Sequence, residues 1–145
     1  MSYHTWHNYG YGICTNTLEN ADVSRIWSLI QMAPSFEARV RAEFDEAEIA
    51  DLNAEDFQEL ECSGPHGIAS ILEAVIREVE KIPLCACDDY DNNRYLLYMP
   101  TYPWYVQESE VKLTEEIVEQ LFAKYVSVLS DEEIEVEYQS VENGG

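Results

Sequence analysis

The sequence has few basic residues and a large excess of acidic ones. Eight Lys and Arg stand against 29 Asp and Glu, which gives a formal net charge of −21 at pH 7. A surface this negative repels DNA, RNA and anionic membranes, over a Debye length of about 8 Å at physiological salt. Nucleic acid and anionic membranes are therefore not expected as direct ligands. The charge favours cations or proteins with basic surfaces, including surfaces that ordinarily hold nucleic acid.

Long apolar runs are also lacking. No stretch approaches the roughly 18 consecutive apolar residues of a membrane-spanning helix, and no basic leader precedes an apolar segment. We therefore expect a cytoplasmic protein. Cysteines are few, and in such a compartment we expect them to be reduced thiols rather than a disulfide framework. They are Cys14, Cys62, Cys85 and Cys87.

Motifs of catalysis and cofactor binding are missing from the sequence. There is no phosphate-binding loop, no G-x-G-x-x-G, no H-E-x-x-H and no nucleophile elbow. Residues His4, His7 and His66 could be combined with a thiol, but no flanking motif supports a nucleophile with its base. We therefore predict a non-enzymatic protein without a cofactor.

Two sets of residues bear a partial likeness to metal sites. Cys62, His66, Cys85 and Cys87 could supply four zinc ligands, but the C-x3-H and C-x-C spacings differ from those usual in structural zinc sites. Small thiols on a strand also serve as core filler, so we predict no metal here. The run Asp89-x-Asp91-x-Asn93 copies the opening of a calcium loop. The next positions lack the required glycine and bidentate glutamate, which favours a surface turn.

The hydrophobic fraction of 46% and the aromatic fraction of 12% are those of a folded chain, and 145 residues fit one domain, 1–145. Periodicity predicts the order β-αααα-β-β-α-β. This order favours an α+β fold with a largely antiparallel four-stranded sheet and about five helices. We expect strands at 3–14, 84–87, 94–99 and 133–139. The predicted helix starts are Asn20, Ser35, Asn53, Pro65 and Thr114, with Pro34 and Pro83 ending the first and fourth helices.

Apolar spacing also predicts which faces are buried. The fourth helix has the broadest apolar stripe, and it should be the most buried helix. The fifth should turn one face inward (Ile117, Leu121, Phe122, Tyr125 and Leu129). In the last strand, Ile134, Val136 and Tyr138 should point to the core and the intervening acidic residues to water.

The acidic residues gather in two stretches. Every charged residue from Glu43 to Glu61 is acidic, and a second concentration runs from Glu108 to Glu142. Carboxylates on helices and strands recur at spacings comparable to those of nucleic-acid phosphates, although an acidic face can also serve solubility alone. A proline-punctuated aromatic loop follows the strand at 94–99 and could supply desolvated anchors. The predicted partner-binding residues are Glu43, Asp45, Glu46, Glu48, Asp51, Tyr102, Trp104 and Tyr105.

Two other functions stay open. The strand glycines Gly10 and Gly12 leave room for a close approach by a backbone, a helix or a ring, for which packing is the favoured explanation and a ligand the alternative. A pocket between this strand and the Tyr102–Tyr105 loop would make the protein a small-ligand-binding domain or an enzyme using Tyr11 and Cys14. A structural or assembly protein is the third possibility.

Three segments carry a resemblance to known proteins. They are Met1-Ser-Tyr-His-Thr-Trp with Tyr9-Gly-Tyr-Gly-Ile13, the Tyr-Pro-Trp at 102–104, and Tyr138-Gln-Ser-Val-Glu-Asn-Gly-Gly145. Together they resemble uncharacterised small acidic proteins of phages and integrating elements of Firmicutes. The resemblance brings no catalytic residues. It implies an accessory protein that inhibits host defence, as anti-CRISPR proteins that imitate nucleic acid do.

Overall fold

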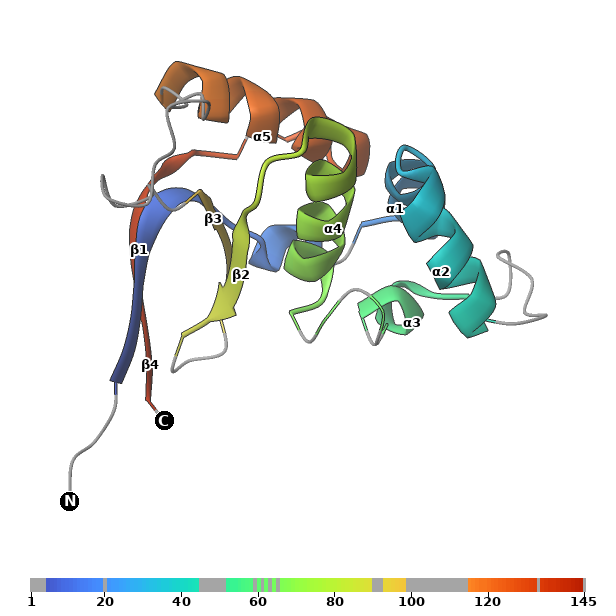
Figure 1. The fold of residues 1–145 in the computed structure, drawn as a ribbon, viewed down its shortest axis with the longest axis horizontal. Helices are drawn as coiled ribbons and strands as arrows, with labels where there is room; N and C mark the ends of the chain where they lie inside the picture. The colour runs from blue at the N-terminus through green and yellow to red at the C-terminus, as the bar shows by residue number, and fades with distance from the viewer. Residues whose placement is uncertain are drawn as a thin grey trace.

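The computed structural model describes residues 5–19, 21–44, 52–58, 60, 62, 64, 66–89, 93–98, 115–132 and 134–144. The predicted α+β class and the element order are confirmed (Figure 1). The elements are β1 (Thr5–Cys14), a short 3-10 turn (Asn16–Leu18), α1 (Val23–Ile30), α2 (Pro34–Phe44), α3 (Ala54–Gln58), α4 (Ile68–Glu80), β2 (Cys85–Asp88), β3 (Arg94–Tyr98), α5 (Glu115–Leu129) and β4 (Glu137–Gly144).

The four strands form one antiparallel sheet in the order β2-β3-β1-β4. Strands β2 and β3 form an antiparallel hairpin, and its register pairs Cys85 with Leu97. Strand β1 joins the hairpin to β4, so β1 and β3 are central. Leu96 and Leu97 are both fully buried, so β3 is covered on both faces.

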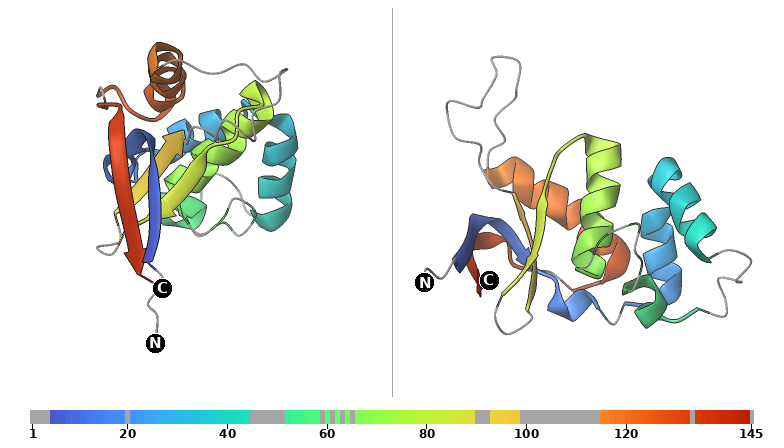
Figure 2. Two further views of the ribbon diagram at one scale, coloured as in Figure 1. Left: turned by 60° about the vertical axis from the view of Figure 1, so that its left-hand side comes forward. Right: turned by 60° about the horizontal axis from the view of Figure 1, so that its bottom comes forward.

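The helices form two layers over one face of the sheet (Figures 1 and 2). In the inner layer α4 packs against β2 and β3, while α5 packs against β1. In the outer layer α1 packs on α4 and α5, and it also contacts α2 and α3. Successive side chains of a strand point to opposite faces of the sheet. Ile13 and Leu96 belong to the main hydrophobic core that the sheet and the helices share, whereas Cys87 and Leu97 form a small separate cluster. As predicted, α4 is the helix with the most buried residues.

The sheet curls strongly around β1. Strands β2 and β4 stand at opposite ends of the strand order, yet some of their Cα atoms lie within 8 Å of one another. A Cβ atom on Gly12 would lie 2.0 Å from the carbonyl oxygen of Leu96. Close approach by another backbone, one of the explanations predicted for the glycine pair, is therefore confirmed at Gly12.

Helix α2 begins two residues earlier than a cap at Ser35 predicts. Pro34 belongs to the helix, and Ser35 is not its cap. The backbone N–H groups of Ser35 and Phe36 instead donate to the two carboxylate oxygens of Glu78 on α4, each at 2.9 Å. These N–H groups lack partners within the helix, so a carboxylate from α4 satisfies them.

Other helix starts were predicted with mixed success. At α3, the Asn53 side chain accepts from the Asp56 N–H at 3.2 Å, and the Asp56 carboxylate accepts from the Asn53 N–H at 2.8 Å. This reciprocal capping confirms Asn53 as the cap. Helix α4 begins at Ile68, after Gly67 with φ of 59°, so the predicted start at Pro65 is wrong. The N-cap of α1 is Asp22.

The predicted faces of the last two elements need correction. Ile117 is 44% exposed, and Val118 is buried in its place. Strand β4 begins at Glu137, and Tyr138 is 51% exposed. The ladder with β1 sets this register, and the alternating segment 134–136 stays outside the strand. None of the described helices combines the length and apolar character that crossing a membrane requires.

Candidate binding groove

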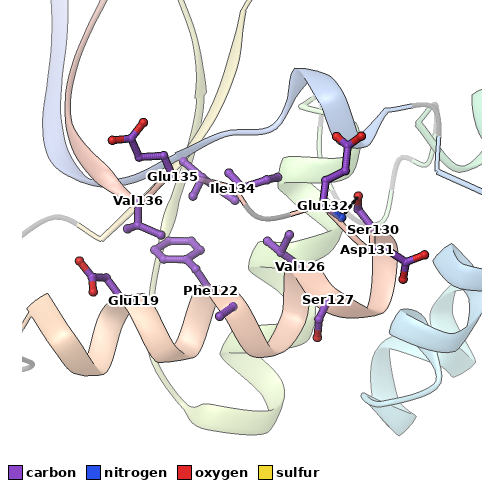
Figure 3. A pocket seen from close by; sticks show the side chains of 12 residues that line it. Glu119, Phe122, Val126, Ser127, Ser130, Asp131, Glu132, Ile134, Glu135 and Val136 are labelled. Carbon is purple, nitrogen blue, oxygen red and sulfur yellow. Dashed lines mark hydrogen bonds between the residues drawn. The ribbon is translucent and has the colours of Figure 1, made fainter.

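A groove of about 710 Å³ lies between α5 and the segment that leads into β4 (Figure 3). Its floor is apolar and its rim is acidic. We call it the α5 groove. The floor residues are Ile13, Phe122, Ala123, Val126, Ile134 and Val136, and the rim carboxylates belong to Glu119, Asp131, Glu132 and Glu135.

The helical repeat of α5 builds one wall of the groove. Residues three and four positions apart share one face of a helix, which places Glu119, Phe122 and Val126 in a row. After the helix, the Ser130 hydroxyl accepts from the Glu132 N–H at 3.1 Å and helps to form the turn. The chain then returns along α5, so Val136 lies opposite the Phe122 ring (Figure 3).

A tyrosine of β1 holds the rim carboxylate of Glu119. The hydroxyl of Tyr11, a buried residue of β1, donates a hydrogen bond to Glu119 Oε1. The Tyr11 ring lies 4.9 Å from the ring of Tyr138, measured between centroids, at an interplanar angle of 51°. One end of the groove therefore combines a positioned carboxylate with two neighbouring rings.

The other rim carboxylates are exposed to solvent. Asp131 pairs with Arg25 of α1 at 2.6 Å, but its side chain is 89% exposed. Glu132 and Glu135 are exposed as well. An exposed ion pair contributes little to stability, since water and salt screen it. These carboxylates therefore give the groove a negative potential without a matching role in packing.

The groove suits a ligand that is both apolar and cationic. Its volume falls within the roughly 300–1,000 Å³ typical of ligand sites. An apolar floor favours an aliphatic or aromatic group, because burial removes apolar surface from water. The rim favours a guanidinium or ammonium group beside it.

Glu43 is the one predicted partner-binding residue within the described part of the chain, and it does not line this groove. Glu43, at the end of α2, accepts a hydrogen bond from the Cys62 N–H at 2.8 Å. The other predicted partner-binding residues lie outside the described part of the chain: Asp45, Glu46, Glu48, Asp51, Tyr102, Trp104 and Tyr105. Their role stays a prediction.

The groove itself was not predicted. Two signals in the sequence pointed towards it: the second acidic concentration contains all four rim residues, and Ile134 and Val136 alternate with acidic side chains. That alternation was interpreted as a strand face. Gly10 and Gly12, at which the alternative pocket was predicted, do not line the groove.

The thiols considered for zinc lie in different environments. On β2, a hydrogen bond from the Cys87 thiol lowers the pKa of Cys85 to about 7 and raises that of Cys87. Burial and the nearby Glu43 raise the pKa of Cys62 to about 11. The imidazole of His66 contacts Asp88 at 2.9 Å. Within the described ranges, no three His, Cys, Asp or Glu side chains are arranged to hold one metal ion.

The calcium-like run forms a hydrogen-bonded turn at its described residues. The Asn93 backbone N–H donates to Asp89 Oδ1 at 2.9 Å, and the Asn93 side-chain amide donates to Oδ2 at 3.0 Å. Both carboxylate oxygens of Asp89 thus close the connection between β2 and β3. Such side-chain contacts to nearby backbone are typical of turns, the interpretation favoured from the sequence.

Comparisons with known proteins return no match among family models, curated proteins or solved structures. The resemblance to small acidic phage proteins therefore stays a prediction.

Proposed function

We propose that this protein is a non-enzymatic, acidic binding protein that docks on a basic surface of a protein partner. Its carboxylates would stand in for the phosphates of nucleic acid on that surface. The observation that supports this most is the α5 groove, where an apolar floor adjoins a rim of exposed carboxylates. Such a combination offers a desolvated contact and electrostatic attraction in one place.

The chain uses most of its described cations elsewhere. Ion pairs away from the groove join Arg41 to Glu37, Arg77 to Glu73, Arg94 to Glu19 and Lys124 to Glu80. Among the ion pairs of the described residues, only that of Arg25 involves a rim carboxylate. Within the described ranges, no Lys or Arg pairs with the other three rim carboxylates, and a basic partner would supply positive charge there.

The partner class follows from the same electrostatics. Surfaces that bind nucleic acid carry Lys and Arg at the spacing of phosphates, so they complement closely spaced carboxylates. An inhibitor of host defence carried by a phage or mobile element is the setting that the resemblance of the chain ends suggests. A nucleic-acid-binding protein of the host is then the partner.

Affinity capture with a rim variant tests this function. The immobilised protein should retain nucleic-acid-binding proteins from a host lysate at low salt, and both high salt and added duplex DNA should release them. The triple variant Glu119→Gln, Glu132→Gln, Glu135→Gln should retain much less. If the retained proteins resist both salt and DNA, or if none is retained, the proposed function is wrong.

A further inference from the structure

We propose that the α5 groove recognises a basic peptide segment of the partner in which an arginine stands beside an aliphatic side chain. The inference rests on the proposed function and specifies what the groove binds. The guanidinium would lie against the Glu119 carboxylate, on the side that the Tyr11 hydroxyl does not occupy. The aliphatic side chain would lie on the floor formed by Phe122, Val126 and Val136.

Glu119 is positioned for a guanidinium. Its Oε1 atom accepts from the hydroxyl of Tyr11, a residue that is only 7% exposed and is therefore held in place by packing. An ionised carboxylate has about four acceptor sites, so one hydrogen bond leaves capacity for a second donor. A planar guanidinium with several N–H groups uses that capacity better than a single ammonium.

The ring of Tyr138 does not line the groove itself, but it lies beside Tyr11, the residue that holds Glu119. It is 51% exposed and packs against Tyr11. An aromatic face attracts a guanidinium within about 6 Å of its centroid. The same chain already shows such contacts, because the guanidinium of Arg41 lies 4.6 Å from the ring centroid of Trp27. Carboxylate and ring together therefore favour arginine over lysine.

The floor requires an apolar companion to that arginine. Val136 and Ile134 are partly buried, and they point towards the α5 side chains Phe122 and Val126 (Figure 3). A free inorganic cation would leave this surface in contact with water. An aliphatic side chain next to the arginine would cover it.

The charge of the chain argues against two other occupants. A second copy would bring another net charge of −21 to an acidic rim, and nucleic acid would bring its phosphates there. Both meet like-charge repulsion. A basic peptide segment satisfies the rim and the floor together.

The test uses short fluorescein-labelled peptides and fluorescence anisotropy. In the first peptide arginine alternates with leucine; in the second arginine alternates with serine, so the charge is unchanged. The third replaces arginine by lysine. We expect the arginine–leucine peptide to bind about tenfold tighter than either of the others, which corresponds to one good hydrogen-bonded charge or one buried aliphatic group.

Two variants with matched controls locate the site. Glu119→Gln should weaken the arginine–leucine peptide about tenfold. Glu116→Gln removes the same charge from an exposed position of α5 that does not line the groove, and it should change binding less than about twofold. Ala123→Arg places a long cation in the groove and should abolish binding. Ala42→Arg on the exposed side of α2 is its control, and circular dichroism should show both variants folded.

The outcomes separate this inference from the proposed function. Equal binding of the leucine and serine peptides, or an Ala123→Arg variant that binds like Ala42→Arg, would overturn the inference. Salt- and DNA-sensitive capture of a partner would then still support the function. If no peptide binds at low salt, the inference is wrong, and the capture experiment decides the function independently.

Discussion

The α4 carboxylates that contact neighbouring helices and the carboxylates around the α5 groove are the same chemical group in two different roles. On α4, Glu78 satisfies the first N–H groups of α2, and Glu80 accepts from Tyr125 and Lys124 of α5. At the groove, Glu132 and Glu135 extend into solvent. Net charge alone therefore does not tell which acidic residues hold the fold and which are available to a partner.

The largest expected effect is on the contact between α4 and α5. Tyr125 is fully buried, and its hydroxyl donates a hydrogen bond to Glu80 Oε2 at 2.5 Å. Replacing Glu80 by alanine leaves that hydroxyl without its acceptor, so we expect Glu80→Ala to lower the free energy of unfolding by about 2 kcal/mol. Urea denaturation measures the change.

Glu73→Ala is the control for Glu80→Ala. It removes an ion pair within α4, to Arg77 at 3.0 Å, whose typical contribution is about 0.3–0.5 kcal/mol. Equal losses in the two variants would mean that Glu80 is an ordinary surface carboxylate.

The next effect is on the start of α2. Glu78→Ala removes the acceptors of the Ser35 and Phe36 amides, and we expect a loss of about 1 kcal/mol, as for a missing helix cap. Hydrogen exchange of these two amides should become faster than that of amides in the middle of α2. If their protection is unchanged, the helix start does not depend on the carboxylate.

A smaller effect should appear with pH. The hydrogen bonds from Tyr125 and Lys124 lower the pKa of Glu80 below its ordinary value of 4.5. Because the folded-state pKa is the lower one, the stabilisation is present above the unfolded-state pKa and is lost as pH falls through the folded-state pKa. The stability difference between the parent chain and Glu80→Gln, about 1 kcal/mol or less after solvent screening, should therefore shrink below pH 4.5. A difference that grows on acidification would contradict the assignment.

The smallest effect is expected at the groove. The double variant Glu132→Gln, Glu135→Gln should keep the free energy of unfolding within about 0.5 kcal/mol, with a slight gain because like charges are removed. The same variant should bind the arginine–leucine peptide more weakly. A stability loss near that of Glu78→Ala would show that the groove carboxylates also hold the fold, and the contrast between the two sides would disappear.

Local patterns were enough to predict much of the fold. Ile71, Leu72, Val75 and Ile76 recur with the helical period, and all four are buried in α4. The capping residues of α3 lie three positions apart, so their reciprocal hydrogen bonds are visible in the sequence. The turn at Asp89 and Asn93 is local in the same sense. Such features depend on neighbours along the chain, and the sequence displays them directly.

The start of α2, the register of β4 and the groove depend on distant residues. Glu78 caps a helix that begins more than forty positions earlier. The alternation of Ile134 and Val136 fits a strand, but pairing with β1 sets the β4 register and leaves both residues to line the groove against α5. Composition and periodicity by themselves determined an acidic α+β protein with a largely antiparallel four-stranded sheet. Only the tertiary structure decided which carboxylates are used internally, because that depends on which helices the core brings together.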